Sequence, residues 1–290
     1  MFRPVSVYVD PSLPPDLGDT PNTWHSQHGQ DYLIASLFKG RRGGSFVDLA
    51  ANAPTFISNT RALERDYGWT GICVDANQDL LFALARHRKC QVVGAVVSSA
   101  SGVAATFRER RGQSANPDGS VRNPHLDALS SIVANDPGAA GPAARRKSRD
   151  ARDANATDRA VRTIAFADLL RAHAAPRRIE FLSLDVEQHE EQVMLAFPYH
   201  EYTFVAATIE TASAPLARVL ERNDYTRLAM AATFADSLWV HASFPGGVAA
   251  AARAANASHA AWRRATRGRS RFAPSPVPAD ALPPAGRRAQ

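Results

Sequence analysis

The sequence contains very little cysteine: Cys73 and Cys90 are the only two in 290 residues, and each lies inside an apolar stretch. Two cysteines exclude the dense disulfide framework that holds many small secreted domains together. No CxxC pair occurs, which excludes a zinc site with the usual cysteine spacing. We therefore expect two buried free thiols, in a reducing compartment or in a protein indifferent to redox state.

Long apolar runs are also missing. Residues 1–19 include an early aspartate and several prolines, and so differ from the apolar core of a signal peptide. No stretch of about 18 apolar residues occurs, although a membrane-spanning helix would need one. These two absences favour a cytoplasmic protein that does not span a membrane.

The formal net charge is +6, but it is unevenly distributed along the chain. Residues 1–245 sum to −1, whereas residues 246–290 carry +7. Five of the arginines in this basic tail lie between Trp262 and Phe272. The tail could contact a polyanion, with the two aromatic rings stacking on bases, or it could be an ordinary solvated tail. The charge thus points to a polyanionic partner for the tail alone.

Apolar runs of strand length alternate with segments of helical periodicity, and this alternation predicts an α/β fold. Continuous apolar strands are typical of a parallel sheet that is covered on both faces. We expect strands at 45–50, 71–75, 91–97, 179–186, 204–210, 225–229 and 237–241. We expect helices at 31–38, 55–67, 78–87, 166–173, 190–197 and 214–222, and a seventh near 248–266.

Three segments fall outside this pattern and set the expected domain limits at 24–245. Residues 1–23 are rich in proline, aspartate and threonine and predict an irregular lead-in. Residues 108–160 show no sustained period, so we expect a flexible insert there, or a lid over a ligand site. The basic tail, 246–290, is rich in alanine, arginine and proline, and we expect disorder over 273–290.

Four of the expected strands end in acidic residues: Asp48, Asp75, Asp185 with Glu187, and Glu210. Open α/β sheets bind ligands at the carboxyl ends of their strands. A carboxylate after the second strand can accept hydrogen bonds from two ribose hydroxyls at once. One such acid could equally cap the following helix, but four on one rim favour a ligand site.

Five motifs follow one another at these strands. They are SQHGQD at 26–31, GSFVDLAAN at 44–52 with SNT at 58–60, GWTGICVDAN at 68–77, LSLDVEQHE at 182–190, and TIE at 208–210 with DSLWVH at 236–241. In this order they resemble the FkbM family of S-adenosylmethionine-dependent methyltransferases, over about residues 24–245 without the insert. The resemblance implies a Rossmann-like class I methyltransferase fold, with a seven-stranded, mostly parallel sheet, helices on both faces and one reversed strand near the C-terminus.

The resemblance also implies where the cofactor, S-adenosyl-L-methionine, would bind. In that fold the loop after the first strand holds the methionine part, the acid after the second strand holds the ribose, and the third strand ends beside the adenine. The positions that correspond here are Asp48, Ala50, Ala51, Asn52, Asn59, Asp75, Asn77 and Val96.

The methyl acceptor would approach the catalytic candidates after the fourth strand, Asp185, Glu187 and His189. A hydroxyl must lose its proton as it attacks the methyl group, and Asp185 or His189 could accept that proton. Alternatively, Asp185 orients the acceptor, while His189 only begins a helix and Glu187 only stabilises the turn. A divalent metal on Asp185, Glu187 and Glu210 is conceivable, but we assign no metal.

The cofactor loop departs from the family pattern. Glycine there lets the backbone approach the ligand and adopt a positive φ, but this chain has Ala50. Ala53 replaces the acid of the loop, and Pro54 removes a backbone N–H. Gln188 replaces the glycine of the fourth-strand motif and could narrow the acceptor pocket.

The function expected from these features is S-adenosylmethionine-dependent methylation of a hydroxyl on a sugar, a glycan or another small molecule. Two alternatives stay open. One is an RNA methyltransferase that uses the basic tail, and the other is a non-catalytic interaction protein on a methyltransferase scaffold.

Overall fold

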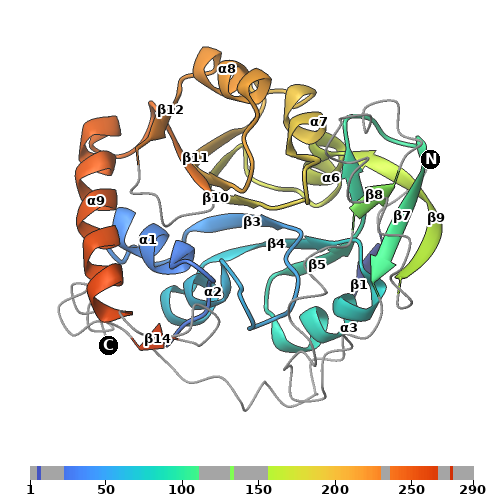
Figure 1. The fold of residues 1–290 in the computed structure, drawn as a ribbon, viewed down its shortest axis with the longest axis horizontal. Coiled ribbons are helices and arrows are strands. Elements are labelled where there is room, and N and C mark those ends of the chain that lie inside the picture. Colours follow the sequence, from blue (N-terminus) through green and yellow to red (C-terminus); the bar gives the residue numbers. More distant parts are fainter. Residues whose placement is uncertain are drawn as a thin grey trace.

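The computed structural model describes residues 5–7, 23–110, 131–133, 156–229, 236–266 and 275–276. Its centre is an eight-stranded sheet, shown in Figure 1. In spatial order the strands are β1 (Val5–Val7), β5 (Gln91–Gly94), β4 (Thr70–Asp75), β3 (Ser45–Leu49), β10 (Arg178–Leu184), β11 (Thr203–Ile209), β13 (Ser237–His241) and β12 (Tyr225–Leu228).

The sheet has eight strands, where seven were expected, and it is mixed. Strands β5, β4, β3, β10 and β11 are parallel to one another, while β13 is antiparallel to both of its neighbours. The eighth strand, β1, pairs antiparallel with β5 and comes from the lead-in that we expected to be irregular. Three residues give too short an apolar run to be recognised as a strand without knowledge of the edge on which they pair.

Chain order reverses between β3 and β10, which are hydrogen-bonded neighbours although they lie far apart in the sequence. Connections leave in opposite directions on the two sides of this point, and a crevice opens at the carboxyl ends of the strands. Asp48 near the end of β3 lies in register with Ser183 of β10 and Cys73 of β4. The sheet thus brings the ends of the first, second and fourth predicted strands together.

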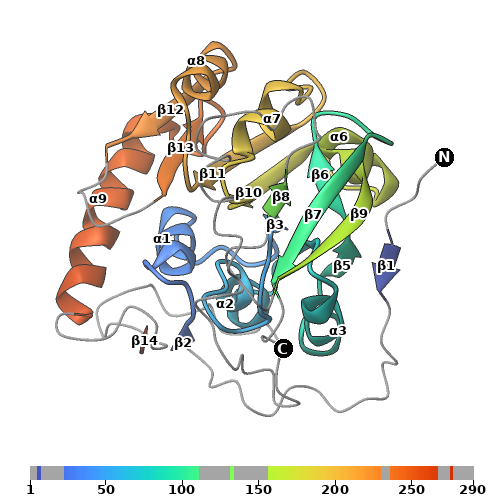
Figure 2. The same cartoon turned by 45° about the vertical axis from the view of Figure 1, so that its right-hand side comes forward.

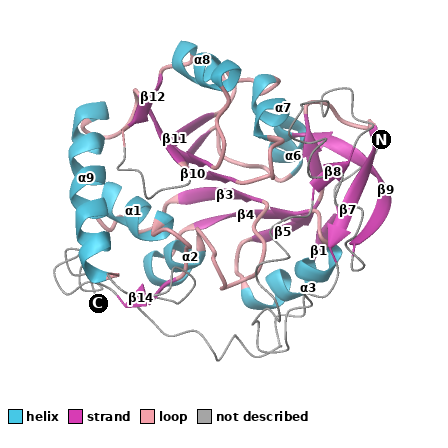
Figure 3. Ribbon diagram, in the orientation of Figure 1, coloured by secondary structure: helices cyan, strands magenta, loops and turns pink. Residues whose placement is uncertain are grey.

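Helices cover both faces of the sheet, as predicted (Figures 1 and 3). One apolar core joins the sheet to α1 (Gln30–Leu37), α2 (Arg61–Tyr67), α3 (Gln78–His87) and α9 (Gly247–Ala265). A second core joins the opposite face to α6 (Phe166–Ala172), α7 (Glu190–Leu195) and α8 (Ala214–Arg222). Among the described residues, no helix has both the length and the apolar character required to cross a membrane.

A second, four-stranded sheet stands beside the carboxyl ends of the central strands (Figure 2). Its strands, in spatial order, are β6 (Val96–Ser98), β9 (Ala156–Ala165), β7 (Ala104–Arg110) and β8 (Ser131–Val133). The expectation of an unstructured insert is wrong at its two ends, because β7 and β9 pair there over seven residues each. The rest of the insert, 111–130 and 134–155, lies outside the described residues.

The basic tail begins with a helix that is part of the fold. Helix α9 packs against α1, and Trp262 is only 9% exposed because its ring stacks on Tyr32 at 5.6 Å. Gly29 has φ 82°, and a Cβ there would lie 2.6 Å from the Trp262 ring. Trp262 is therefore not available to stack on bases, and the helix is not a detachable tail.

The rest of the tail is described only at Ser275–Pro276, a short strand β14 that pairs with β2 (Thr23–Trp24). Three of the arginines, Arg267, Arg269 and Arg271, lie outside the described residues together with Phe272, as does most of the segment expected to be disordered. A contact with a polyanion therefore stays a prediction for these residues.

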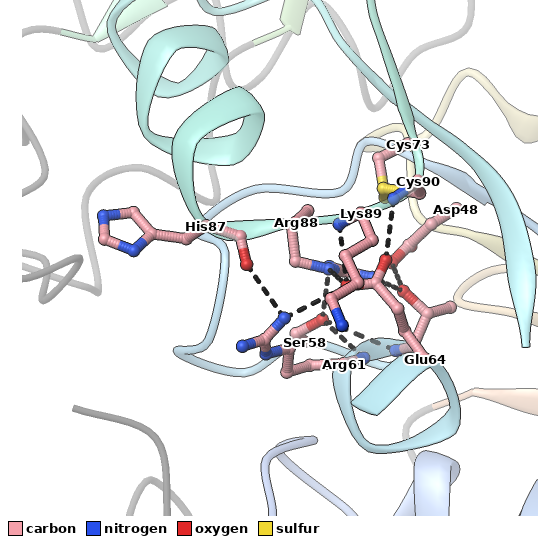
Figure 4. Close-up of a disulfide and its surroundings, with 10 residues drawn as sticks. Asp48, Ser58, Arg61, Glu64, Cys73, His87, Arg88, Lys89 and Cys90 are labelled. Atoms are coloured by element: carbon pink, nitrogen blue, oxygen red, sulfur yellow. Dashed lines mark hydrogen bonds and ion pairs between the residues drawn. A yellow bond between two sulfur atoms is a disulfide. The ribbon is translucent and has the colours of Figure 1, made fainter. Parts of the chain in front are cut away.

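The prediction of two free thiols is wrong, because Cys73 and Cys90 form a disulfide (Figure 4). The bond joins β4 to the segment that enters β5, and both cysteines are buried. Disulfides persist in oxidising environments, so the pairing does not support the reducing compartment that was expected.

A buried polar network lies beside the disulfide in Figure 4. Glu64 on α2 accepts hydrogen bonds from the backbone N–H groups of Lys89 and Cys90, at 3.0 and 2.9 Å. Arg88 donates to Glu64 at 3.3 Å and to the Thr60 hydroxyl at 2.7 Å. Burial alone would raise the pKa of Glu64, but Arg88 and the other donors outweigh it and lower the pKa. The network fixes the start of α2 behind the carboxyl end of β3.

Candidate active site

A cavity that opens to solvent lies at the carboxyl ends of the central strands. The structure brings every predicted cofactor and catalytic residue to its lining, although their roles stay predictions. The predicted residues in the lining are Asp48, Ala50, Ala51, Asn52, Asn59, Asp75, Asn77, Val96, Asp185, Glu187 and His189.

The loop after β3 adopts the conformation that its sequence disfavours. Ala50 and Asn52 have φ of 66° and 54°, in the left-handed region where glycine is usual. The backbone N–H groups of Ala50 and Ala51 both donate to the Val74 carbonyl at 2.9 Å, so β4 holds the loop in place. Alanine in this conformation costs roughly 1–2 kcal/mol, which these hydrogen bonds offset. The loop thus contains a left-handed residue at position 50 although the residue there is alanine.

Asp75 at the end of β4 binds the neighbouring loops through its carboxylate. One oxygen accepts from the Asn52 N–H and the other from the Asn77 N–H, both at 2.8 Å. Burial raises the pKa of Asp75 to about 6, against the lowering effect of these backbone hydrogen bonds. A carboxylate has lone pairs for about four hydrogen bonds, so Asp75 can still accept from a ligand in the cavity.

Asp48 lies deeper, where it is 3% exposed. It accepts a hydrogen bond of 2.5 Å from the Thr60 hydroxyl, which in turn accepts from Arg88. Burial raises the pKa of Asp48, and the positive charge of Arg88 opposes this rise. Asp48 is thus the link between the cavity and the buried network of Glu64 and Arg88.

Three carboxylates lie close together, and two of them, Asp185 and Glu187, line the cavity. Asp185, Glu187 and Glu210 each offer an oxygen within 4.8 Å of the others, a spacing at which they could hold a cation together. Burial, and then the negative charges of Glu210 and Glu187, raise the pKa of Asp185 well above its usual value. Asp185 is therefore a stronger base than an exposed aspartate.

A fourth acid, Asp236, lies near this group, directly before β13 in the chain. Asp236 accepts a hydrogen bond of 2.9 Å from the side chain of Gln30, at the start of α1. Burial raises the pKa of Asp236 to about 6, and Glu210 adds to the effect. The first and last motifs of the chain, around Gln30 and Asp236, thus meet beside the acidic group.

The turn that carries Glu187 is held by the next helix. Glu187 and Gln188 both have positive φ, 56° and 74°, so Gln188 adopts the conformation for which glycine is suited. Glu190 accepts hydrogen bonds from the N–H groups of Val186 and Gln188, at 3.0 and 3.2 Å. The Gln188 side chain is exposed, and only its neighbours line the cavity.

His189 occupies the N-cap position of α7 and is 6% exposed. Its Nε2 atom lies 2.9 Å from the hydroxyl of Ser98, at the end of β6. The imidazole therefore links the turn of the fourth strand to the second sheet.

A sequence profile described as the methyltransferase FkbM domain matches residues 48–225, which is more than half of the chain. The chain belongs to the FkbM methyltransferase family. No curated protein and no solved structure matches the chain. The FkbM segment begins at Asp48 and ends at Tyr225, so it contains all of the predicted cofactor and catalytic residues but neither α1 nor β13.

Sequence reasoning missed several residues of the FkbM site. Phe107 and Ile132 from the second sheet line the cavity, as do Ile57 and Leu80. In β7 the buried residues are Ala105, Phe107 and Glu109, every second one, but because one of them is charged the sequence shows no apolar alternation that could have revealed the strand. No local pattern could have revealed Arg88, whose partners lie on a helix that begins 27 residues earlier.

Proposed function

We propose that this FkbM methyltransferase transfers the methyl group of S-adenosyl-L-methionine to a hydroxyl oxygen of a sugar, a glycan or another small molecule. The observation that carries the proposal is that Asp185 and Glu187 line the same cavity as the loops after β3 and β4, with Glu210 close behind them. An ionised carboxylate accepts hydrogen bonds and donates none, so these residues suit a methyl-acceptor molecule that donates hydrogen bonds from its hydroxyl groups.

The residues around the cofactor loops fit S-adenosyl-L-methionine. The Oδ1 atom of Asn52 is buried and has no hydrogen-bond partner within the described part of the chain, so it offers an acceptor to the amino group of the ligand. Asp75 can hold the ribose hydroxyls, and Val96 lines the cavity together with other apolar residues, among them Leu80 and Val97. The acidic surroundings also suit the positive charge of the sulfonium.

When bound, S-adenosyl-L-methionine supplies an electrophilic methyl group on a positively charged sulfur. The chain supplies the proton transfer. Asp185, with its raised pKa, accepts the proton of the acceptor hydroxyl as the oxygen attacks the methyl group. The negative charges of Glu210 and Glu187 favour the protonated form of Asp185, because the proton relieves the repulsion between the three carboxylates. Glu190 holds the turn, so that Glu187 keeps its place relative to Asp185.

Calorimetric titration of the protein with S-adenosyl-L-methionine and with S-adenosylhomocysteine tests the proposal. We expect one site per chain with a dissociation constant in the micromolar range. Absence of binding heat over several temperatures, in protein shown by circular dichroism to be folded, would reject the proposal and favour a non-catalytic role.

Replacement of Asp185 by asparagine separates chemistry from binding. Asparagine keeps the shape of the side chain but cannot take up the proton, so we expect kcat to fall about 10²–10⁴-fold. Affinity for S-adenosylhomocysteine should stay within a few-fold of wild type. The measurement is transfer of labelled methyl groups to a panel of sugars, glycans and other hydroxylated compounds.

The matched control for this variant is Glu221→Gln on the exposed face of α8. It removes one carboxylate in the same way and should leave kcat unchanged. Full activity of the Asp185→Asn variant would show that positioning alone drives the transfer.

A further inference from the structure

We propose that Phe107 of β7, together with Ile132 of β8, forms the apolar wall against which the adenine ring of the cofactor packs. We further propose that Glu109 and Arg159, which form an ion pair, hold this wall in position. The inference rests on the proposed function, because it requires an adenosine-containing cofactor. It gives the second sheet a role in cofactor binding.

The residues of the proposed wall line the cavity. Phe107 is 5% exposed and Ile132 is half-buried, and both line the cavity together with Leu80 and Val96. Asp75 and Asn77, which are placed to hold the ribose, line the same cavity. An aromatic ring and branched apolar side chains are the usual surroundings for a flat, weakly polar base.

Two hydrogen bonds join the second sheet to the loop that follows Asp75. Glu109 accepts from the backbone N–H of Gln78 at 2.6 Å, which caps the start of α3. Arg159 of β9 donates to the Ala76 carbonyl at 2.7 Å. The wall and the ribose-binding loop are thus held to the same backbone, between Asp75 and Gln78.

The two side chains that make these bonds also bind each other around Phe107. Arg159 and Glu109 form an ion pair at 3.5 Å, and the Arg159 guanidinium lies 5.8 Å from the centre of the Phe107 ring. Glu109 is 4% exposed, so its charge needs these partners. The arrangement fixes the ring beside the cavity and sets its distance from the ribose-binding loop.

Binding of two ligands to matched variants tests the inference. We expect Phe107→Ala to weaken both S-adenosylhomocysteine and adenosine by the same factor, on the order of tenfold, because stacking acts on the base they share. Phe107→Trp should retain most of the affinity for both. The matched control is Phe82→Ala on α3, where the ring is 60% exposed and away from the cavity lining, and it should change neither affinity.

A double-variant cycle tests the positioning role of Arg159. If Arg159 acts by placing Phe107, then Arg159→Met weakens both ligands in the wild-type background and has little effect in the Phe107→Ala background. Equal effects in both backgrounds would show that Arg159 acts independently of the ring, and would overturn this part of the inference. Thermal unfolding of each variant verifies that it is folded at the temperature of the titration.

The remaining outcomes separate this inference from the proposed function. Wild-type protein that binds neither ligand overturns both. Wild-type protein that binds S-adenosylhomocysteine, with a folded Phe107→Ala variant that binds it equally well, overturns the wall alone. Loss of S-adenosylhomocysteine without loss of adenosine also overturns it, since the ring would then contact the amino-acid part.

Discussion

The Asp75→Ala variant is expected to bind S-adenosyl-L-methionine about 100-fold more weakly than wild type, or worse. In the proposed function this carboxylate accepts from two ribose hydroxyls, and each charge-assisted hydrogen bond contributes roughly 1.5–3 kcal/mol. Its removal also deprives the Asn52 and Asn77 N–H groups of their acceptor, at the two loops that frame the cavity. Calorimetric titration measures the loss.

The pH dependence of binding gives this prediction a second readout. Because burial raises the pKa of Asp75 to about 6, the carboxyl gains a proton as the pH falls through that value. The protonated form cannot accept from both hydroxyls. Wild-type affinity should therefore be constant above pH 7 and should fall by up to about tenfold per pH unit well below pH 6.

Two variants serve as controls for Asp75. Asp75→Asn keeps one acceptor oxygen and should lose less affinity, without the pH dependence that Asp75 causes. Glu221→Ala removes an exposed acid and should bind as wild type does. An Asp75→Ala variant with wild-type affinity would show that the ribose is bound elsewhere, even if the chain binds the cofactor.

The Arg88→Met variant is expected to lose about 3–5 kcal/mol of folding free energy. The Arg88 side chain is fully buried and pairs with Glu64, whose side chain is 2% exposed. Removing Arg88 alone leaves the buried Glu64 carboxylate without most of its positively charged surroundings. This costs far more folding free energy than removing both charged side chains together. It also deprives Thr60 of a donor, next to Asp48. Denaturant unfolding under non-reducing conditions measures the change.

Arg171→Met is the matched control for this prediction. Arg171 makes an ion pair of 2.6 Å with Glu201, but its side chain is 45% exposed, and such surface pairs contribute about 0–1 kcal/mol. A loss in Arg88→Met as small as in this control would mean that water or Arg61 compensates Glu64. The double variant Arg88→Met with Glu64→Leu should recover part of the stability.

The elements predicted best are those whose pattern is complete within one segment. Helices α3 and α8 and strand β13 have the predicted bounds, because apolar periodicity and their end residues lie together in the sequence. The helix expected at 55–67 begins only at Arg61, since the preceding residues form the turn that places Asn59 and Thr60. The strand expected at 91–97 divides at Ala95, where the chain passes from one sheet to the other.

The features that were missed depend on contacts between distant segments. The disulfide requires Cys90, just before β5, to reach Cys73 in the middle of β4, and only the pairing of those strands brings them together. The strand β9 was hidden by its charged residues, Asp158, Arg159 and Arg162, which interrupt any apolar pattern in the sequence. The predicted site residues were brought together because each follows a strand, and parallel strands end at one edge of a sheet.

The contact between α1 and α9 has a consequence for the protein's synthesis. The two helices are separated by about 210 residues, so a ribosome that adds roughly 5–20 residues per second produces α9 some ten seconds or more after α1. During that interval the Tyr32 side of α1 has no Trp262 to cover it. The nascent chain must therefore keep this apolar face of α1 uncovered until α9 has been synthesised.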